Sequence, residues 1–136
     1  MKNSIIILSI ATMLVACTSV PMRKTDAFIT APTGVNEMTP QEARPALEAA
    51  YVQFIDVRTV EEYNGGHAVR SRNIPLDTVM QNLDKLEKNE PVYLICQTGN
   101  RSMKAAQMLS EAGFPQTISI KGGTVAWQES GLPITK

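Results

Sequence analysis

A short segment in the second half of the chain carries residue types that suit nucleophilic chemistry. It reads Cys96, Gln97, Thr98, Gly99, Asn100 and Arg101, and it lies between an apolar run and a predicted helix that begins near Ser102. Successive backbone N–H groups of such a loop can point into one concavity, to which the helix adds the positive end of its dipole. Gly99 allows the tight path, and Arg101 adds a fixed positive charge. We expect this pocket to favour an anion or a thiolate.

Cys96 is the candidate nucleophile of this loop. In electropositive surroundings the pKa of a cysteine falls from about 8.5 to roughly 3.5–7.5, so the thiolate forms at neutral pH without a histidine base. A buried cysteine that acts only as a small hydrophobe is the alternative for Cys96 taken alone. The neighbouring residues favour the chemical role.

Composition excludes several other classes of function. The chain has 136 residues, with 13 basic and 13 acidic side chains and no long run of either sign, so nothing indicates a surface for nucleic acid. Cys17 and Cys96 are the only cysteines and His67 is the only histidine. These are too few for a zinc site built from Cys and His or for a disulfide scaffold. We therefore expect one globular domain without a metal.

Helices and strands are predicted to alternate along this domain. Thr39, Pro40 and Glu42 form a helix start with a cap, a first-turn proline and a capping box, and the helix runs to about Ala50. Strands are predicted over residues 51–57, 92–95 and 117–120, because these runs are apolar and rich in β-forming residues. Apolar residues at helical spacing predict two further helices. The first stripe is Leu76, Val79, Leu83 and Leu86, and the second is Ala105, Met108, Leu109 and Ala112, ended by Gly113.

This alternation predicts an α/β fold with a mostly parallel central sheet and helices on both faces. Ligands of such folds bind beyond the carboxyl ends of the strands. Asp56 and Arg58 come at the end of the first predicted strand, and Cys96 follows the second. We expect these side chains at one edge of the sheet.

Residues 1–16 are predicted to be a lipoprotein signal peptide. The apolar run at residues 5–13 is shorter than the about 20 helical residues that span a bilayer. Small residues before Cys17 resemble the bacterial lipobox, in which the cysteine becomes the lipidated first residue of the mature chain. A simple secretory signal with an incidental cysteine and an uncleaved anchor are the alternatives.

The mature chain is expected to be a tethered, exported lipoprotein. Residues 17–36 contain Pro21, Pro32 and Gly34 without an apolar period, which predicts a flexible tether, and residues 37–136 form the domain. The expected location is the periplasmic side of a membrane, held through the lipid on Cys17. Thr18 in place of an acidic residue predicts sorting to the outer membrane where the host has two membranes.

Five blocks of sequence, in order, resemble the rhodanese-like sulfurtransferases, and the resemblance runs from Met38 to Pro133. Among these, the chain is most similar to the small exported single-domain thiosulfate sulfurtransferases of the phage-shock type. The blocks are Ile55-Asp56-Val57-Arg58 with Glu61-Glu62-Tyr63, Gly66-His67 with Asn73-Ile74-Pro75, the loop from Cys96 to Ser102, Gly122-Gly123 with Trp127, and Gly131-Leu132-Pro133.

The resemblance implies a rhodanese-like domain that transfers sulfur. Cys96 would attack the outer sulfur of thiosulfate, release sulfite and keep a persulfide, which then passes its sulfur to cyanide or a thiol. The loop residues Gln97, Thr98, Gly99 and Asn100 would bind the substrate with Arg101, and no metal or organic cofactor is required. Asp56 and Arg58 would mainly organise the loops at the strand ends.

The resemblance also implies structural roles for His67, Trp127 and the Gly122-Gly123 turn. The chain departs from the family at residues 68–72, where Arg70 and Arg72 replace a small, glycine-containing apolar turn. We expect these two charges near the pocket, where they would tune the substrate.

Two other functions compete with sulfur transfer. Related phosphatases and arsenate reductases use a cysteine, an anion-binding loop and an arginine, but with a longer spacing than the four residues between Cys96 and Arg101. A membrane-anchored persulfide carrier or binding module is the non-catalytic alternative, because a fold alone does not secure activity. The sequence leaves the physiological donor, the acceptor and the oligomeric state open.

Overall fold

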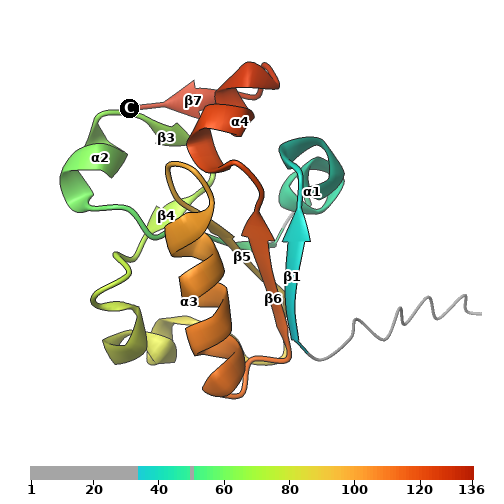
Figure 1. Cartoon of the computed structure of the whole chain (residues 1–136), viewed down its shortest axis with the longest axis vertical. Helices are drawn as coiled ribbons and strands as arrows, with labels where there is room; N and C mark the ends of the chain where they lie inside the picture. Colours follow the sequence, from blue (N-terminus) through green and yellow to red (C-terminus); the bar gives the residue numbers. More distant parts are fainter. Residues whose placement is uncertain (1–33, 50) are drawn as a thin grey trace, which may run out of the picture.

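The computed structural model describes residues 34–49 and 51–136 (Figure 1). The predicted signal peptide, the predicted lipidation site at Cys17 and most of the predicted tether lie outside the described residues. Within the described ranges, no helix combines the length and the apolar character that a membrane crossing needs.

A five-stranded parallel sheet forms the centre of the domain, in the order β1-β6-β5-β2-β4. All residues of β2 and β5 are buried, as expected for strands covered on both faces. A short antiparallel ladder joins β3 to β7 beside the sheet. The strands are β1 (Gly34–Met38), β2 (Gln53–Asp56), β3 (His67–Ala68), β4 (Arg72–Asn73), β5 (Val92–Ile95), β6 (Gln116–Ile120) and β7 (Ile134–Thr135).

Helices cover both faces of the sheet. The face under α3 buries Ile55, Leu94 and Leu109 in one apolar cluster, and the opposite face packs Phe54 and Trp127 into a second cluster with α1. Phe54 and Ile55 point to opposite faces because successive side chains alternate along a strand. The predicted α/β fold is thereby confirmed. The helices are α1 (Pro40–Leu47), α2 (Val60–Asn64), α3 (Asn100–Glu111) and α4 (Gly123–Glu129), with 3-10 turns η1 (Val79–Gln81) and η2 (Leu83–Lys85).

The domain begins earlier than predicted. Gly34, Val35 and Asn36, placed in the tether from their sequence, lie in β1 and pair in register with Gln116, Thr117 and Ile118 of β6. β1 is an edge strand whose residues are only partly buried, so its sequence lacks the apolar run that marked the inner strands.

The predicted helix over residues 76–86 is wrong, because the chain makes the two 3-10 turns η1 and η2 there instead. Asn82 stands between them with φ −117° and ψ 25°, outside helical geometry, and its side-chain amide donates to the Thr78 carbonyl at 2.8 Å. Asparagine competes with helix formation through such local bonds. The apolar stripe is still used, because Val79 and Leu86 are buried in the cluster under α3.

The boundaries of two helices also differ from those predicted. The capping box of Thr39 and Glu42 is confirmed, but α1 ends at Leu47, short of the predicted Ala50. The helix after Cys96 begins at Asn100 rather than near Ser102. The short helix α2 was not predicted, although Thr59 and Glu62 form a second capping box at its start.

Candidate active site

Cys96 lies at the carboxyl end of β5, where the chain turns into α3. The residue is 1% exposed, and the loop closes around its sulfur. The backbone N–H of Gly99 donates to Sγ at 3.1 Å, and the thiol lies 3.5 Å from the Ser102 hydroxyl oxygen. Gly99 precedes α3 with φ 100°, a conformation that glycine adopts at little cost. The concavity of backbone donors expected from the sequence is present.

Neutral donors control the ionisation of Cys96. Burial raises the pKa of the thiol, but hydrogen bonds from the Ser102 side chain and from the backbone N–H groups of Ser102, Thr98 and Gly99 outweigh it, so the pKa lies below its ordinary value. The Ser102 hydroxyl donates to the Gly99 carbonyl at 3.0 Å and lies 2.8 Å from the Ser119 hydroxyl oxygen. Since a hydroxyl rotates and carries one hydrogen, Ser102 donates to the thiolate when it turns that hydrogen from the carbonyl to Sγ. The site thus favours a thiolate without a histidine base. Ser102 and Ser119 were not predicted as site residues.

The start of α4 holds the backbone of the Cys96 loop in place. Thr124 N–H donates to the Cys96 carbonyl at 2.7 Å, and Val125 N–H donates to the Gln97 carbonyl at 3.2 Å. Gly123 has φ 60°, and a Cβ there would collide with the backbone of Cys96 and Gln97. The glycine pair expected to form a turn therefore also permits a close approach of two backbones.

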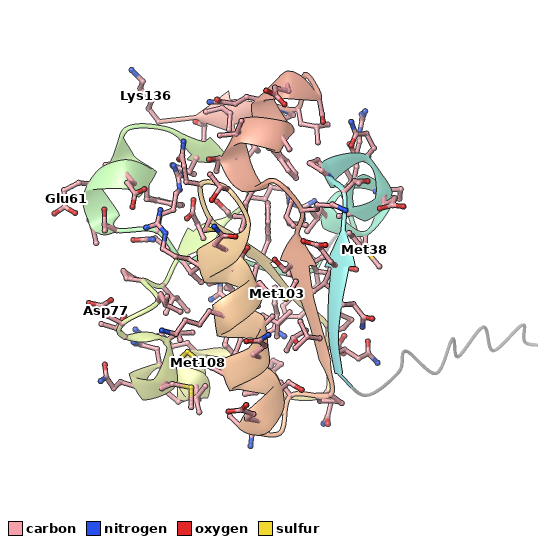
Figure 2. All side chains as sticks on the ribbon, in the orientation of Figure 1. Met38, Glu61, Asp77, Met103, Met108 and Lys136 are labelled. Atoms are coloured by element: carbon pink, nitrogen blue, oxygen red, sulfur yellow. The ribbon has the colours of Figure 1, made fainter. Side chains whose placement is uncertain are left out.

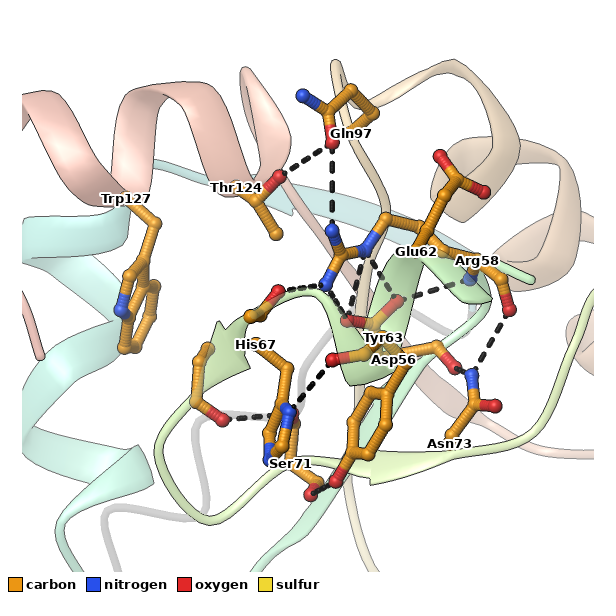
Figure 3. Close-up of polar contacts among 12 residues, drawn as sticks. Asp56, Arg58, Glu62, Tyr63, His67, Ser71, Asn73, Gln97, Thr124 and Trp127 are labelled. Carbon is orange, nitrogen blue, oxygen red and sulfur yellow. Dashed lines mark hydrogen bonds and ion pairs between the residues drawn. The ribbon is translucent and has the colours of Figure 1, made fainter. Parts of the chain in front are cut away.

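Asp56 and Arg58 form a buried ion pair on one side of the Cys96 loop (Figure 3). We call this the inner side of the loop. Arg58 Nη2 lies 2.7 Å from Asp56 Oδ2, and its Nε contacts both carboxylate oxygens at 3.0 Å. The same guanidinium donates to the Gly66 carbonyl at 2.9 Å and reaches Gln97 Oε1 at 3.5 Å. Thr124 Oγ1 donates to that Gln97 oxygen at 3.1 Å. The pair therefore ties β2, the segment before β3 and the Cys96 loop together.

Arg101 forms a second ion pair, with Glu62, on the more exposed side of the loop. We call this the outer side. Its Nη1 and Nη2 each lie 2.7 Å from one oxygen of Glu62, and about a third of each side chain is exposed. The hydrogen bond from Arg101 is the largest cause that lowers the pKa of Glu62 to about 2. Arg101, expected to hold an anion, is thus held by a carboxylate that was not predicted as a site residue. The Thr59 capping box indicates that residue 62 lies in the first turn of a helix, but it does not indicate the pairing with Arg101.

Two open cavities flank the outer pair. One, of about 420 Å³, is lined by Arg101 together with Lys104, Asp77 and apolar side chains. The other, of about 460 Å³, is lined by Glu62 and Gln97 among others. The Glu62–Arg101 pair therefore stands between two spaces large enough for small sulfur compounds.

The remaining predicted residues occupy different places. Gln97, Thr98 and Asn100 have exposed side chains, so Thr98 reaches the sulfur through its backbone alone. His67 stacks on the Tyr63 ring at 3.6 Å, and its Nδ1 lies 2.9 Å from the Tyr63 carbonyl oxygen. These contacts fit the structural role expected for it.

The expectation for Arg70 is wrong, because its guanidinium binds the end of α1 instead of facing the pocket. It donates to the Leu47 and Ala49 carbonyls at 3.1 and 2.6 Å. Carbonyl groups at a helix C-terminus favour such a cation. Arg72 is exposed in β4. Among the described residues, no three His, Cys, Asp or Glu side chains are grouped to hold a metal ion.

Comparison with known proteins places this geometry in a family. The model of the rhodanese-like domain matches residues 39–130. An uncharacterised protein, YqhL of Bacillus subtilis, is 40% identical over 90 residues, which cover 66% of this chain and 70% of that protein. The thiosulfate sulfurtransferase GlpE of Actinobacillus pleuropneumoniae serotype 3 is 34% identical over 98 residues, covering 72% of this chain and 91% of the relative.

Solved structures agree with these relatives. A rhodanese-like domain protein from Staphylococcus aureus is similar with a TM-score of 0.65 and 36% identity, over 74% of this chain and 99% of that chain. A rhodanese-related protein from Thermoplasma volcanium gives a TM-score of 0.66 at 28% identity, over 74% and 97%. Cys96, its loop and both ion pairs lie inside the matched residues, and the chain belongs to the rhodanese-like domain family.

Proposed function

We propose that this protein is a sulfurtransferase that moves a sulfane sulfur from thiosulfate, or a similar donor, through a Cys96 persulfide to cyanide or a thiol. One observation carries the proposal: the Cys96 sulfur lies within a loop of backbone donors that lower its pKa. A lowered pKa supplies the nucleophilic thiolate. The similarity to GlpE supports thiosulfate as donor.

In the first step the Cys96 thiolate attacks the outer sulfur of thiosulfate. A bond forms between Sγ and that sulfur, the sulfur–sulfur bond of thiosulfate breaks, and sulfite leaves with the electron pair. The products are a Cys96 persulfide anion and sulfite, so the total charge is unchanged. The Gly99 and Thr98 amides that stabilise the thiolate are placed to stabilise the persulfide, and the N-terminus of α3 favours the same charge.

In the second step an acceptor thiolate or cyanide attacks the terminal sulfur of the persulfide. The bond to Sγ breaks, the Cys96 thiolate is restored, and the acceptor leaves as a persulfide or as thiocyanate. The Cys96 sulfur is again a thiolate at the end of the cycle, so the cycle needs no metal and no organic cofactor. Arg58 and Gln97 act as positioning residues, because their contacts hold the loop and not the reacting sulfur.

The test is intact-mass spectrometry of the reduced chain before and after thiosulfate, with sulfite measured in parallel. Cys17→Ser in every sample makes Cys96 the single cysteine, and Cys96→Ser is the control. The expected result is the gain of one sulfur atom on the protein that retains Cys96, with an equal amount of sulfite. A folded protein that gains no sulfur from thiosulfate or from persulfide donors would support a binding module instead. A persulfide that no acceptor discharges would indicate a carrier.

We propose further that Cys17 is lipidated and anchors the domain to a membrane on the exported side. The support is the sequence alone, in which Leu14-Val15-Ala16 precedes the cysteine after a short apolar run. Metabolic labelling with a radioactive fatty acid in a bacterial host tests this proposal. Label in the native chain and its loss in Cys17→Ala are expected, and an unlabelled native chain would contradict it.

A further inference from the structure

The outer ion pair is built from a carboxylate that does two tasks. Glu62 accepts the backbone N–H of Thr59 at 3.0 Å and so caps α2. Its two oxygens also accept from Nη1 and Nη2 of Arg101, at 2.7 Å each. The cap fixes the carboxylate on α2, and the carboxylate in turn fixes the guanidinium at the first turn of α3, five residues after Cys96 in the chain. A rigid helix end therefore decides where the charge of Arg101 lies.

The charges of the two ion pairs beside the Cys96 loop cancel. Arg58 is neutralised by Asp56 and Arg101 by Glu62. Lys104 and Asp77 line the same cavity and balance each other formally. The remaining attraction for an anion comes from backbone donors, the end of α3 and Lys136, which lines the second cavity together with Glu62 and Gln97. Without Glu62, this site would carry one positive charge more.

We propose that Glu62 is a specificity-determining residue, which neutralises Arg101 and thereby shifts the preference of the site from dianionic sulfur donors towards donors with one negative charge or none, such as persulfides. The inference rests on the proposed sulfur transfer for its choice of donors. Glu62 occupies one hydrogen on each Nη of Arg101, so an anionic donor that binds this guanidinium lies close to the Glu62 carboxylate, and the repulsion between them rises with the charge of the donor.

The chain offers a matched pair of variants. Glu62→Gln removes the charge but keeps a side chain that caps α2, since glutamine also completes a capping box. Glu61→Gln removes the same charge one residue away, on a side chain that points outward from α2 (Figure 2). A general effect of net charge would appear in both variants. An effect that depends on Arg101 would appear at Glu62 alone.

Alkylation of Cys96 measures the local charge without requiring sulfur transfer. The thiolate displaces iodide from iodoacetate, an anion, or from iodoacetamide, which is neutral, and the ratio of the two rate constants reports the field at Sγ. In the full chain with Cys17→Ser, Glu62→Gln should raise this ratio roughly three- to tenfold, the size expected for one unpaired charge nearby. Glu61→Gln should leave it within about twofold, and added salt should reduce the rise.

The activity with sulfur donors should depend on their charge in the same way. Glu62→Gln should raise kcat/KM for thiosulfate about tenfold and for a monoanionic persulfide only about threefold, because the interaction scales with donor charge. Arg101→Gln leaves the Glu62 carboxylate unpaired and should lower the alkylation ratio, so the proposal is testable even if Glu62→Gln fails to fold.

Distinct results overturn the two proposals. Equal alkylation ratios in the native chain, Glu62→Gln and Glu61→Gln would overturn the role of Glu62, whatever the activity. A raised ratio in Glu62→Gln without persulfide from any donor would keep that role and overturn sulfur transfer. A Cys96 that neither reagent alkylates and that gains no sulfur from any donor would overturn both.

Discussion

The two sides of the Cys96 loop each carry one arginine–carboxylate pair, and the two pairs differ in their surroundings. On the inner side, Asp56 is fully buried and the Arg58 side chain is 5% exposed. On the outer side, about a third of Arg101 and of Glu62 is exposed. The hydrogen bonds within the pairs have equal shortest lengths, 2.7 Å.

This difference separates a structural pair from an exchangeable one. Breaking a buried pair leaves an uncompensated charge in the interior, which is strongly destabilising. A pair that is about one third exposed contributes little to stability, since water solvates either partner after separation. The inner side of the loop is therefore fixed by the fold, while the pair on the outer side can separate without unfolding the domain.

Removing the inner arginine should have the largest effect. Arg58→Ala leaves Asp56 buried without its partner and should lower the free energy of unfolding by about 3–5 kcal/mol, as measured by urea denaturation. Arg101→Ala, the same change on the outer side, should cost about 1 kcal/mol or less. Similar losses for the two variants would break the comparison, because burial would then not distinguish the pairs.

The backbone contact between Gly123 and the Cys96 loop should have the next largest effect. Gly123→Ala has to open the close approach to Cys96 and Gln97, and overpacking with a positive φ should cost about 2–4 kcal/mol. Gly131→Ala is the matched control, since Gly131 has φ 71° but nothing within 4 Å of an added Cβ. It should cost about 1–2 kcal/mol. Equal losses in thermal unfolding would show that backbone strain, and not the contact, dominates on the inner side.

Ser102→Ala should separate the control of ionisation from both arginines. It removes a donor to the Cys96 sulfur, so the pKa of Cys96 should rise towards its ordinary value, with a loss of about 1–2 kcal/mol in stability. The pH dependence of iodoacetamide alkylation measures this pKa. A larger rise in Arg58→Ala than in Ser102→Ala would mean that the inner ion pair controls the thiolate.

The sequence predicts the parts of this site that are local. Cys96 follows the buried run at 92–95, and Gly99 stands at the turn before a helix, so the nucleophile and its cradle could be expected before the fold was known. The same holds for the capping box at Thr39. Each feature depends on residues close together along the chain.

The parts that depend on distant contacts could not be predicted. Arg101 pairs with Glu62, 39 residues away, and nothing near Arg101 in the sequence indicates that a carboxylate contacts both of its Nη atoms. β1 is a strand only because β6 offers it a partner. The 3-10 turns at residues 79–85 present the same apolar face as a helix, so spacing alone could not tell them apart.

Acid titration of the outer pair should give the smallest effect. The pKa of Glu62 is lowered from 4.5 to about 2 in the folded protein. A lowered folded pKa means that its stabilisation is fully present above pH 4.5 and is lost as the pH falls towards 2. The native chain should exceed Glu62→Gln in the free energy of unfolding by less than about 1 kcal/mol at pH 6, because the pair is partly exposed. That difference, measured by urea denaturation at several pH values, should shrink between pH 4.5 and 2.

The control is the corresponding difference between the native chain and Glu61→Gln, which should not change in step with it. A constant Glu62 difference across this window would show that the carboxylate contributes through its cap on α2 alone, which glutamine also supplies, and the outer pair would then have no part in stability at any pH.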